Sequence, residues 1–311
     1  MKHLHKISFL LIPAAVLLLV APQLIALEQD TTKKVYGTFV EKSSGKLITD
    51  MGPNEVMIVE DNKQRPPTSV QKATEPISIV LLADSSAAVG GGGIGATRSS
   101  ATATAAGDVI NDIRAAFTEF TKQMMAANPK NEVALMEFGQ ASIMMVPFTS
   151  NGDDIIKALT RLVVKPNADS VLLEGIMESS KEIGKRPNAR RAIISVNVLP
   201  DSEKSSEPAN NIMKEIAKDG ATFFSASLQK GDLKNSVRGP MLEGFADRTG
   251  GKRDVIVGQS ALVGLLKSYG DIINAQYEVT YTRPVGAPPQ LIQWATSRPD
   301  VKIYQSKFPP K

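Results

Sequence analysis

A continuous apolar run at residues 77–83, ISIVLLA, most constrains what this chain can fold into. A strand with one solvated face alternates apolar and polar residues, so an unbroken apolar run bounded by polar residues predicts a strand buried on both faces. Such strands lie in parallel sheets that helices cover on both sides. The run therefore predicts an α/β fold with this strand near the middle of the sheet.

Extended and helical patterns alternate after this strand. A Gly/Ala/Ser/Thr-rich loop is predicted at 90–107, and an amphipathic helix at 107–127. Two residues alone separate the strands at 132–139 and 142–149, which forces an antiparallel hairpin. Further strands are predicted at 191–199, 221–228 and 252–257, and further helices at 150–163, 168–184, 207–220, 240–250 and 260–276. This order predicts an α/β fold built on a doubly wound, mostly parallel six-stranded sheet.

The segments that flank this α/β region are rich in β-forming residues. We expect an N-terminal β segment at 33–75, the α/β domain at 76–275, and a C-terminal β segment at 276–311. The N- and C-terminal segments are expected to pack together as a small β lobe.

Residues 1–26 have the pattern of a secretory signal peptide. Lys2 and Lys6 precede the apolar stretch SFLLIPAAVLLLV at 8–20, and Ala26 provides a small residue for cleavage. The alternative is an uncleaved anchor, because residues 8–26 nearly reach the length that spans a bilayer. We therefore expect an exported protein, periplasmic or secreted, or anchored in the inner membrane if the segment is retained.

The chemistry open to the exported chain is narrow. The chain has no cysteine, and its two histidines, His3 and His5, lie in the leader. Catalytic sites built on Ser–His–Asp or Cys–His, and zinc sites built on His and Cys, are thereby excluded. Any bound metal would be a hard cation held by oxygen atoms. Without the leader the chain has 34 basic and 32 acidic residues, too balanced to indicate a nucleic-acid partner, and nothing indicates a membrane partner beyond the leader.

The loop after the first apolar strand, in LLADSSAAVGGGG at 81–93, is where a doubly wound sheet places its binding site. One interpretation is a dinucleotide fingerprint, because Gly90, Gly92 and Gly95 satisfy G-x-G-x-x-G and Glu137 could bind a ribose. The glycines begin six residues after Asp84, however, and not in a tight turn. A second interpretation is an oxygen-ligand metal site, and a third is a set of local hydrogen bonds at the end of a strand.

The stretch IVLLADSSAAV resembles the first strand and loop of a von Willebrand factor type A domain, and MIVEDNKQ at 57–64 is similar to a motif that precedes this domain in bacterial exported members. The resemblance implies a metal-ion-dependent adhesion site, in which serine, threonine and aspartate oxygens hold a metal. Asp84 and Ser86 match the first two ligands, and Ser170 matches the threonine. Ala88 stands in place of the second serine, and Val198 in place of the last aspartate.

The resemblance thus implies a degenerate adhesion site that binds Mg²⁺ or Ca²⁺ weakly, if at all. Asp169 and Asp201 are the residues that could restore its lost ligands. The function expected is non-catalytic binding of a protein or another extracellular ligand through the carboxyl ends of the strands. The alternative is a structural scaffold of an envelope complex with a vestigial site and no metal. No pair of acidic residues at a catalytic spacing supports an enzyme.

Overall fold

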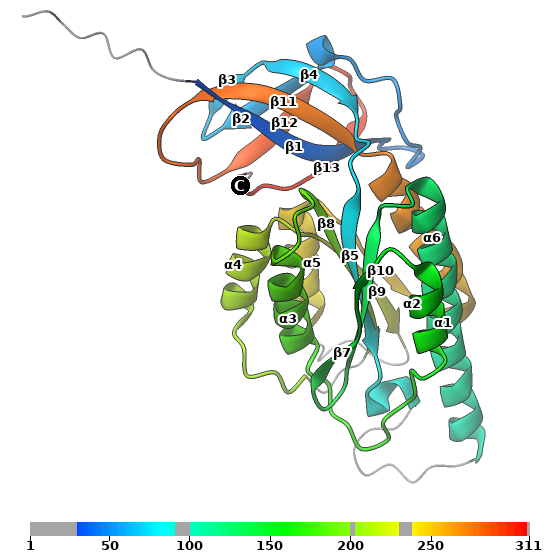
Figure 1. The fold of residues 1–311 in the computed structure, drawn as a ribbon. Coiled ribbons are helices and arrows are strands. Elements are labelled where there is room, and N and C mark those ends of the chain that lie inside the picture. The colour runs from blue at the N-terminus through cyan, green and yellow to red at the C-terminus, as the bar shows by residue number, and fades with distance from the viewer. Residues whose placement is uncertain (1–29, 91–99, 200–202, 230–237, 310–311) are drawn as a thin grey trace, which may run out of the picture.

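The computed structural model describes residues 30–90, 100–199, 203–229 and 238–309, and the predicted leader at 1–26 lies outside them. A six-stranded sheet forms the centre of the larger part, in the order β10-β9-β8-β5-β6-β7 (Figure 1). Neighbouring strands are parallel except β6 and β7, which form the predicted hairpin. The strands are β5 (Ile77–Asp84), β6 (Glu132–Phe138), β7 (Ser142–Thr149), β8 (Arg190–Leu199), β9 (Thr222–Gln229) and β10 (Arg253–Ile256). The predicted fold class is confirmed.

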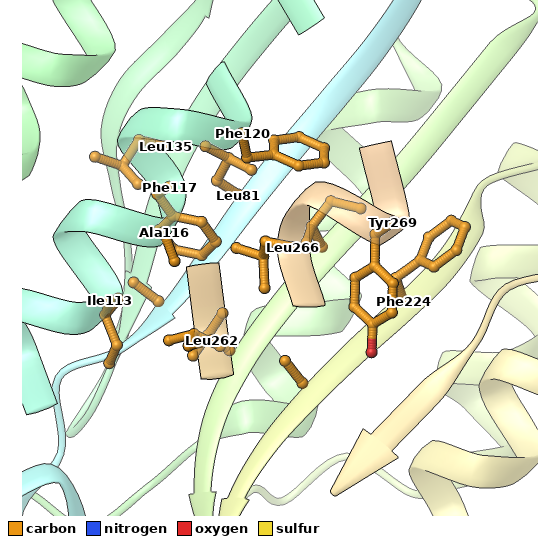
Figure 2. Packing of buried hydrophobic residues seen from close by; sticks show 14 of the residues in the cluster. Leu81, Ile113, Ala116, Phe117, Phe120, Leu135, Phe224, Leu262, Leu266 and Tyr269 are labelled. Atoms are coloured by element: carbon orange, nitrogen blue, oxygen red, sulfur yellow. The ribbon is translucent and has the colours of Figure 1, made fainter. Parts of the chain in front are cut away.

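Helices cover both faces of this sheet, which explains why every residue of β5 is buried and most are apolar. Residues Ile79 and Leu81 belong to one core cluster, and Val80 and Leu82 belong to the other, because successive side chains of a strand point to opposite faces. The first face is covered by α1 (Ser100–Ala127), α2 (Gly152–Leu159) and α6 (Leu262–Asn274). The second is covered by α3 (Leu172–Gly184), α4 (Ala209–Asp219) and α5 (Arg238–Thr249). Figure 2 shows Leu81 packed among Phe117 and Phe120 of α1 and Leu266 of α6.

Helix α1 begins earlier than the sequence predicts. Residues 90–107 are predicted as a loop, but the helix starts at Ser100. The added segment, SATATAA, contains four copies of alanine, the strongest helix-forming residue. The cost of serine and threonine in a helix is below about 1 kcal/mol each. The polar residues of this stretch were therefore a weaker loop signal than the prediction assumed. A short 3-10 helix, η2 (Ala87–Gly90), separates β5 from the residues that precede α1.

The two flanking segments pair into a β lobe. Its four-stranded sheet has the order β13-β1-β11-β4, and its three-stranded sheet the order β12-β2-β3. The strands are β1 (Asp30–Glu41), β2 (Val56–Glu60), β3 (Lys63–Arg65), β4 (Pro67–Lys72), β11 (Tyr277–Pro284), β12 (Ile292–Thr296) and β13 (Val301–Gln305). A 3-10 helix, η1 (Pro53–Glu55), precedes β2, and another, η3 (Gln259–Ala261), precedes α6 of the α/β part. Phe39 lies at the centre of the lobe, with ring centroids 5.4 Å from Tyr277 and 5.7 Å from Trp294. Aromatic contacts between the two flanks therefore hold the lobe together.

The β lobe and the carboxyl ends of the central strands lie at opposite ends of the molecule (Figure 1). Residues 73–76 alone link β4 to the start of β5, so the lobe lies at the amino ends of the parallel strands. The opposite edge, where β5, β6, β8 and β9 end, is called the carboxyl edge below. Among the helices of the described residues, none is long and apolar enough to cross a membrane.

Candidate functional site

Asp84, the last residue of β5, is fully buried at the carboxyl edge. Its Oδ1 accepts hydrogen bonds from the Ser86 backbone N–H at 2.9 Å and from the Ser86 hydroxyl at 2.6 Å. Its Oδ2 accepts from the backbone N–H of Val198, in β8, at 3.0 Å. The bond from residue i to residue i+2 is the usual local turn that aspartate forms at a strand end. This carboxylate therefore holds its own loop and ties β5 to β8.

Backbone hydrogen bonds bring the segment before α3 against the loop that follows β5. The N–H of Lys165 donates to the carbonyl of Ser85 at 2.8 Å, and the N–H of Ala87 donates to the carbonyl of Ala168 at 2.9 Å. Ser170 follows directly and is fully buried. The two predicted site segments, 84–86 and 168–170, are thus brought together at the carboxyl edge.

The hydroxyl of Ser170 accepts a hydrogen bond from Nη2 of Arg238. Arg238 is the first residue of α5 and is fully buried. Its Nε also donates to the Glu203 carboxylate at 2.5 Å, and the Glu203 side chain is only 6% exposed. Its guanidinium carbon lies 5.9 Å from the ring centroid of Phe138, the residue paired with Asp84 across β5 and β6. A cationic side chain therefore occupies the interior of this site.

The Arg238 charge also acts on Asp84. Burial raises the pKa of the Asp84 carboxyl, and the positive charge of Arg238 is the largest influence that opposes this rise. The hydrogen bonds from Ser86 and Val198 oppose it as well. Since a buried charge is costly unless it is paired, the two carboxylates of Asp84 and Glu203 explain how Arg238 is accommodated.

Sequence reasoning missed Arg238 as a residue of the site. The predicted helix began at residue 240, and an arginine that precedes a helix is usually solvated. One weak signal was present, because a cation in the first turn of a helix opposes the helix dipole and is disfavoured unless something else compensates it. The compensating carboxylates lie 35 residues away for Glu203 and much farther along the chain for Asp84, so no local pattern contains them.

A second ion pair lies at the carboxyl edge. Lys165 Nζ donates to Glu137 Oε1 at 2.6 Å, and the Glu137 side chain is largely buried near the end of β6. Glu137 was the candidate ribose ligand of the dinucleotide interpretation, and this carboxylate is instead engaged by Lys165. Gly92 and Gly95 of that fingerprint lie outside the described residues.

Comparison with known proteins identifies the fold around this site. The family profile described as von Willebrand factor type A domain matches residues 79–197, which run from β5 into β8. The structure named von Willebrand factor type A from Catenulispora acidiphila has a TM-score of 0.52 and 8% identity, and the match covers 89% of this chain and 75% of that one. Residues 79–197 thus match a von Willebrand factor type A (VWA) domain, and the central sheet with its helices has the VWA fold.

Proximal thread matrix protein 1 from the mussel byssus is also similar in fold, with a TM-score of 0.51 and 15% identity over 65% of this chain and 49% of that one. The match thus spans about half the length of the mussel protein. The same protein was also solved with a zinc-occupied MIDAS motif, and that structure has a TM-score of 0.50, 14% identity and coverages of 65% and 48%. No curated protein sequence matches this chain. At such identities the likeness establishes the VWA fold alone.

The residues of this VWA domain do not provide an open set of metal ligands. Both Asp84 oxygens and the Ser170 hydroxyl already accept hydrogen bonds from protein donors. Ala88 has no side-chain oxygen, and Val198 offers a backbone donor where a ligand would need an acceptor. Within the described ranges, no group of three or more acidic side chains could hold a metal ion. The donor set that the described residues provide therefore does not fit a divalent cation.

The two residues predicted to compensate for lost ligands have different outcomes. Asp169 is partly buried, and its Oδ1 is a buried atom that lacks a hydrogen-bond partner among the described residues. Asp201 lies outside the described residues. Asn197, next to Val198, is turned toward β9, because its amide bonds the hydroxyls of Ser225 and Ser227, each at 3.0 Å. The Asn197 side chain therefore links β8 to β9.

Proposed function

We propose that this chain is an exported, non-catalytic binding protein that contacts a protein or another extracellular ligand through the carboxyl edge of its VWA domain. The fold supports this class by analogy only. The mussel neighbour is a thread matrix protein. The leader-like pattern of residues 1–26 supports export to the periplasm or the exterior.

The absence of a catalytic group supports a binding role over an enzymatic one. The chain after the leader has no histidine and no cysteine. The buried carboxylates of the carboxyl edge are engaged, Glu137 by Lys165 and Glu203 by Arg238. A general base must be free to take a proton from a substrate, and a carboxylate that neutralises a buried cation is poorly suited to that task.

Exposed apolar side chains at the carboxyl edge are the observation that carries this proposal. Ile143, at the start of β7, is 44% exposed, and Val257, directly after β10, is 80% exposed. They lie at the two outer strands of the sheet, on the same edge as Asp84. The proposal assigns these two side chains to the contact with the partner, because each offers apolar surface that association would bury.

Charge substitutions on this edge test the proposal. We expect the double variant Ile143→Glu/Val257→Glu to reduce partner capture by about fivefold or more, which corresponds to about 1 kcal/mol, because each substitution places an unpaired charge in an apolar contact. The tagged chain is cross-linked in the envelope of the organism that makes it, and the captured proteins are quantified by mass spectrometry.

The β lobe offers a matched control. Leu291 is 40% exposed and Val285 is 57% exposed, so Leu291→Glu/Val285→Glu introduces the same charges at the opposite end of the molecule. Capture that falls equally in both double variants, or in neither, contradicts binding through the carboxyl edge.

The structural scaffold remains the second candidate, and one observation favours it. Asp84, Ser170 and Arg238 are fully buried, so none of these three described side chains is open to an external ligand. A scaffold held through its lobe would show the reverse pattern, with capture lost only in Leu291→Glu/Val285→Glu. A weakly bound Mg²⁺ or Ca²⁺ would instead appear as an Asp84-dependent signal in a metal titration.

A further inference from the structure

A charged side chain buried at the centre of a metal-binding fold needs a physical reason. Arg238 contacts one residue of the expected ligand set directly, through the Ser170 hydroxyl, and another electrostatically, through the charge of Asp84. A metal ion bound by the same residues would make the same two interactions, by coordination. The guanidinium group and a metal ion are therefore alternatives for one location.

The surroundings are arranged for a guanidinium group. Nε and Nη2 face different acceptors, the Glu203 carboxylate and the Ser170 hydroxyl, as the planar fork of arginine allows. The Glu203 segment is positioned for this contact, because its backbone bridges to Ser170 and the N–H of Lys204 donates to the Ser170 carbonyl at 2.8 Å. The Ser205 N–H also donates to Glu203 Oε1 at 3.0 Å, which orients the carboxylate.

The charge balance also opposes a metal. Within the described ranges, the carboxylate of Glu203 pairs with Arg238, and that of Asp84 interacts with its charge. A divalent ion added beside the guanidinium would be repelled at short range in a site from which water is largely excluded. The losses of a serine at Ala88 and of an aspartate at Val198 remove two groups that only a metal would need.

We propose that Arg238 is a built-in cation that replaces the metal ion of the adhesion site, so that the carboxyl edge of this VWA domain is held in one arrangement without metal. Binding through this edge would then be insensitive to chelators. This inference rests on the proposed function, because it concerns the same carboxyl edge. Its test measures metal affinity and melting temperature, so the inference can fail while partner capture through this edge is still observed.

The first measurement uses the unmodified full chain. Mn²⁺, Mg²⁺ and Ca²⁺ are each titrated by calorimetry to about 1 mM, the range of weak extracellular calcium sites, with Asp84→Asn as the control. We expect no heat that depends on Asp84. Metal binding that is present in the wild type and lost in Asp84→Asn overturns the proposal.

The second measurement isolates Arg238. Ala88→Ser/Val198→Asp restores the two missing ligands, and the same pair of changes is combined with Arg238→Ala. We expect the variant without arginine to bind Mn²⁺ about 100-fold more tightly than the variant that retains it, because the repulsion is removed. Mn²⁺ should also raise the melting temperature of the arginine-free variant alone.

A second pair covers the case in which aspartate at the buried position 198 prevents folding. Ala88→Ser is then compared with Ala88→Ser/Arg238→Ala by the same titration. If removal of Arg238 fails to increase Mn²⁺ affinity in any pair that folds, the missing ligands alone exclude the metal, and the proposal is wrong.

Discussion

Replacing Arg238 by methionine is expected to lower the free energy of unfolding by about 3–5 kcal/mol, because it removes one partner of a buried ion pair. Methionine retains the apolar stem but no charge. Glu203, whose side chain is 6% exposed, then loses its cation, and the fully buried Asp84 loses the charge that most opposes the rise in its pKa. The loss arises from uncompensated anions and not from lost volume.

The pH dependence of this loss separates a charge effect from a packing effect. Burial raises the pKa of Asp84 above its unfolded value, and removal of Arg238 raises that pKa further. A folded state with a raised carboxyl pKa binds more protons than the unfolded state, so its stability falls as pH rises through the interval between the two pKa values. The deficit of Arg238→Met relative to the wild type is therefore expected to shrink as pH is lowered, whereas a packing defect would be constant.

Urea denaturation at several pH values measures this deficit, with two kinds of control. Arg161→Met changes an exposed arginine after α2 and is expected to alter stability by less than about 0.5 kcal/mol. Arg238→Met/Glu203→Leu removes both members of the pair and should recover about half of the loss, because an apolar pair of similar volume replaces a buried salt bridge well. A single variant as stable as the wild type would contradict a buried, functional ion pair.

The sequence predicts those features of this fold that local patterns encode. The apolar run at 77–83 identifies β5, since burial on both faces removes the alternation of apolar and polar residues that a half-exposed strand would show. The two-residue link predicted after Gly139 identifies the hairpin of β6 and β7, and this signal is also confined to neighbouring residues. The order of strands and helices then restricts the topology to a few choices.

The residues at the centre of the candidate site are far apart in the sequence, so local patterns do not predict their contacts. Ser170 was expected at the start of a helix, but α3 begins at Leu172, and Ser170 is held instead by the segment at Glu203. Arg238 bonds Ser170 across 68 residues and Glu203 across 35. A pattern within a short stretch of sequence cannot contain residues this far apart. The lost ligands at Ala88 and Val198 are therefore recognisable from the sequence, but the role of Arg238 is not.

Replacing Gly250 by alanine is expected to lower the free energy of unfolding by about 3–4 kcal/mol, from a strained backbone and a steric clash together. Gly250 ends α5 with φ of 79°, in the left-handed region that disfavours any side chain. An added Cβ would lie 2.2 Å from the carbonyl carbon of Gln305 in β13. Because that neighbour is backbone, no side-chain rotation can relieve the contact.

Two other glycines separate the two contributions. Gly220 has φ of 65° and nothing within 4 Å of an added Cβ, so Gly220→Ala carries the strain alone, about 1–2 kcal/mol. Gly251 lacks the positive φ, but its Cβ would lie 1.9 Å from the carbonyl oxygen of Phe223 in β9, so Gly251→Ala carries the clash alone. Denaturation of the three variants tests this, and equal losses in Gly220→Ala and Gly250→Ala would show that β13 yields to the added carbon.

The steric clash in Gly250→Ala is expected to weaken the contacts between the β lobe and α5 first. Gln305 belongs to the β lobe, and the adjoining contacts to α5 are the Lys307 N–H to the Arg248 carbonyl at 2.9 Å and Lys307 Nζ to Asp247 Oδ2 at 2.6 Å. A displaced β13 would weaken these contacts before it reached the central sheet. Hydrogen exchange is therefore expected to accelerate in β13 and its partner β1 while β5 and β8 remain protected. Uniform acceleration through all four strands would instead mean that the lobe and the VWA domain unfold as one unit.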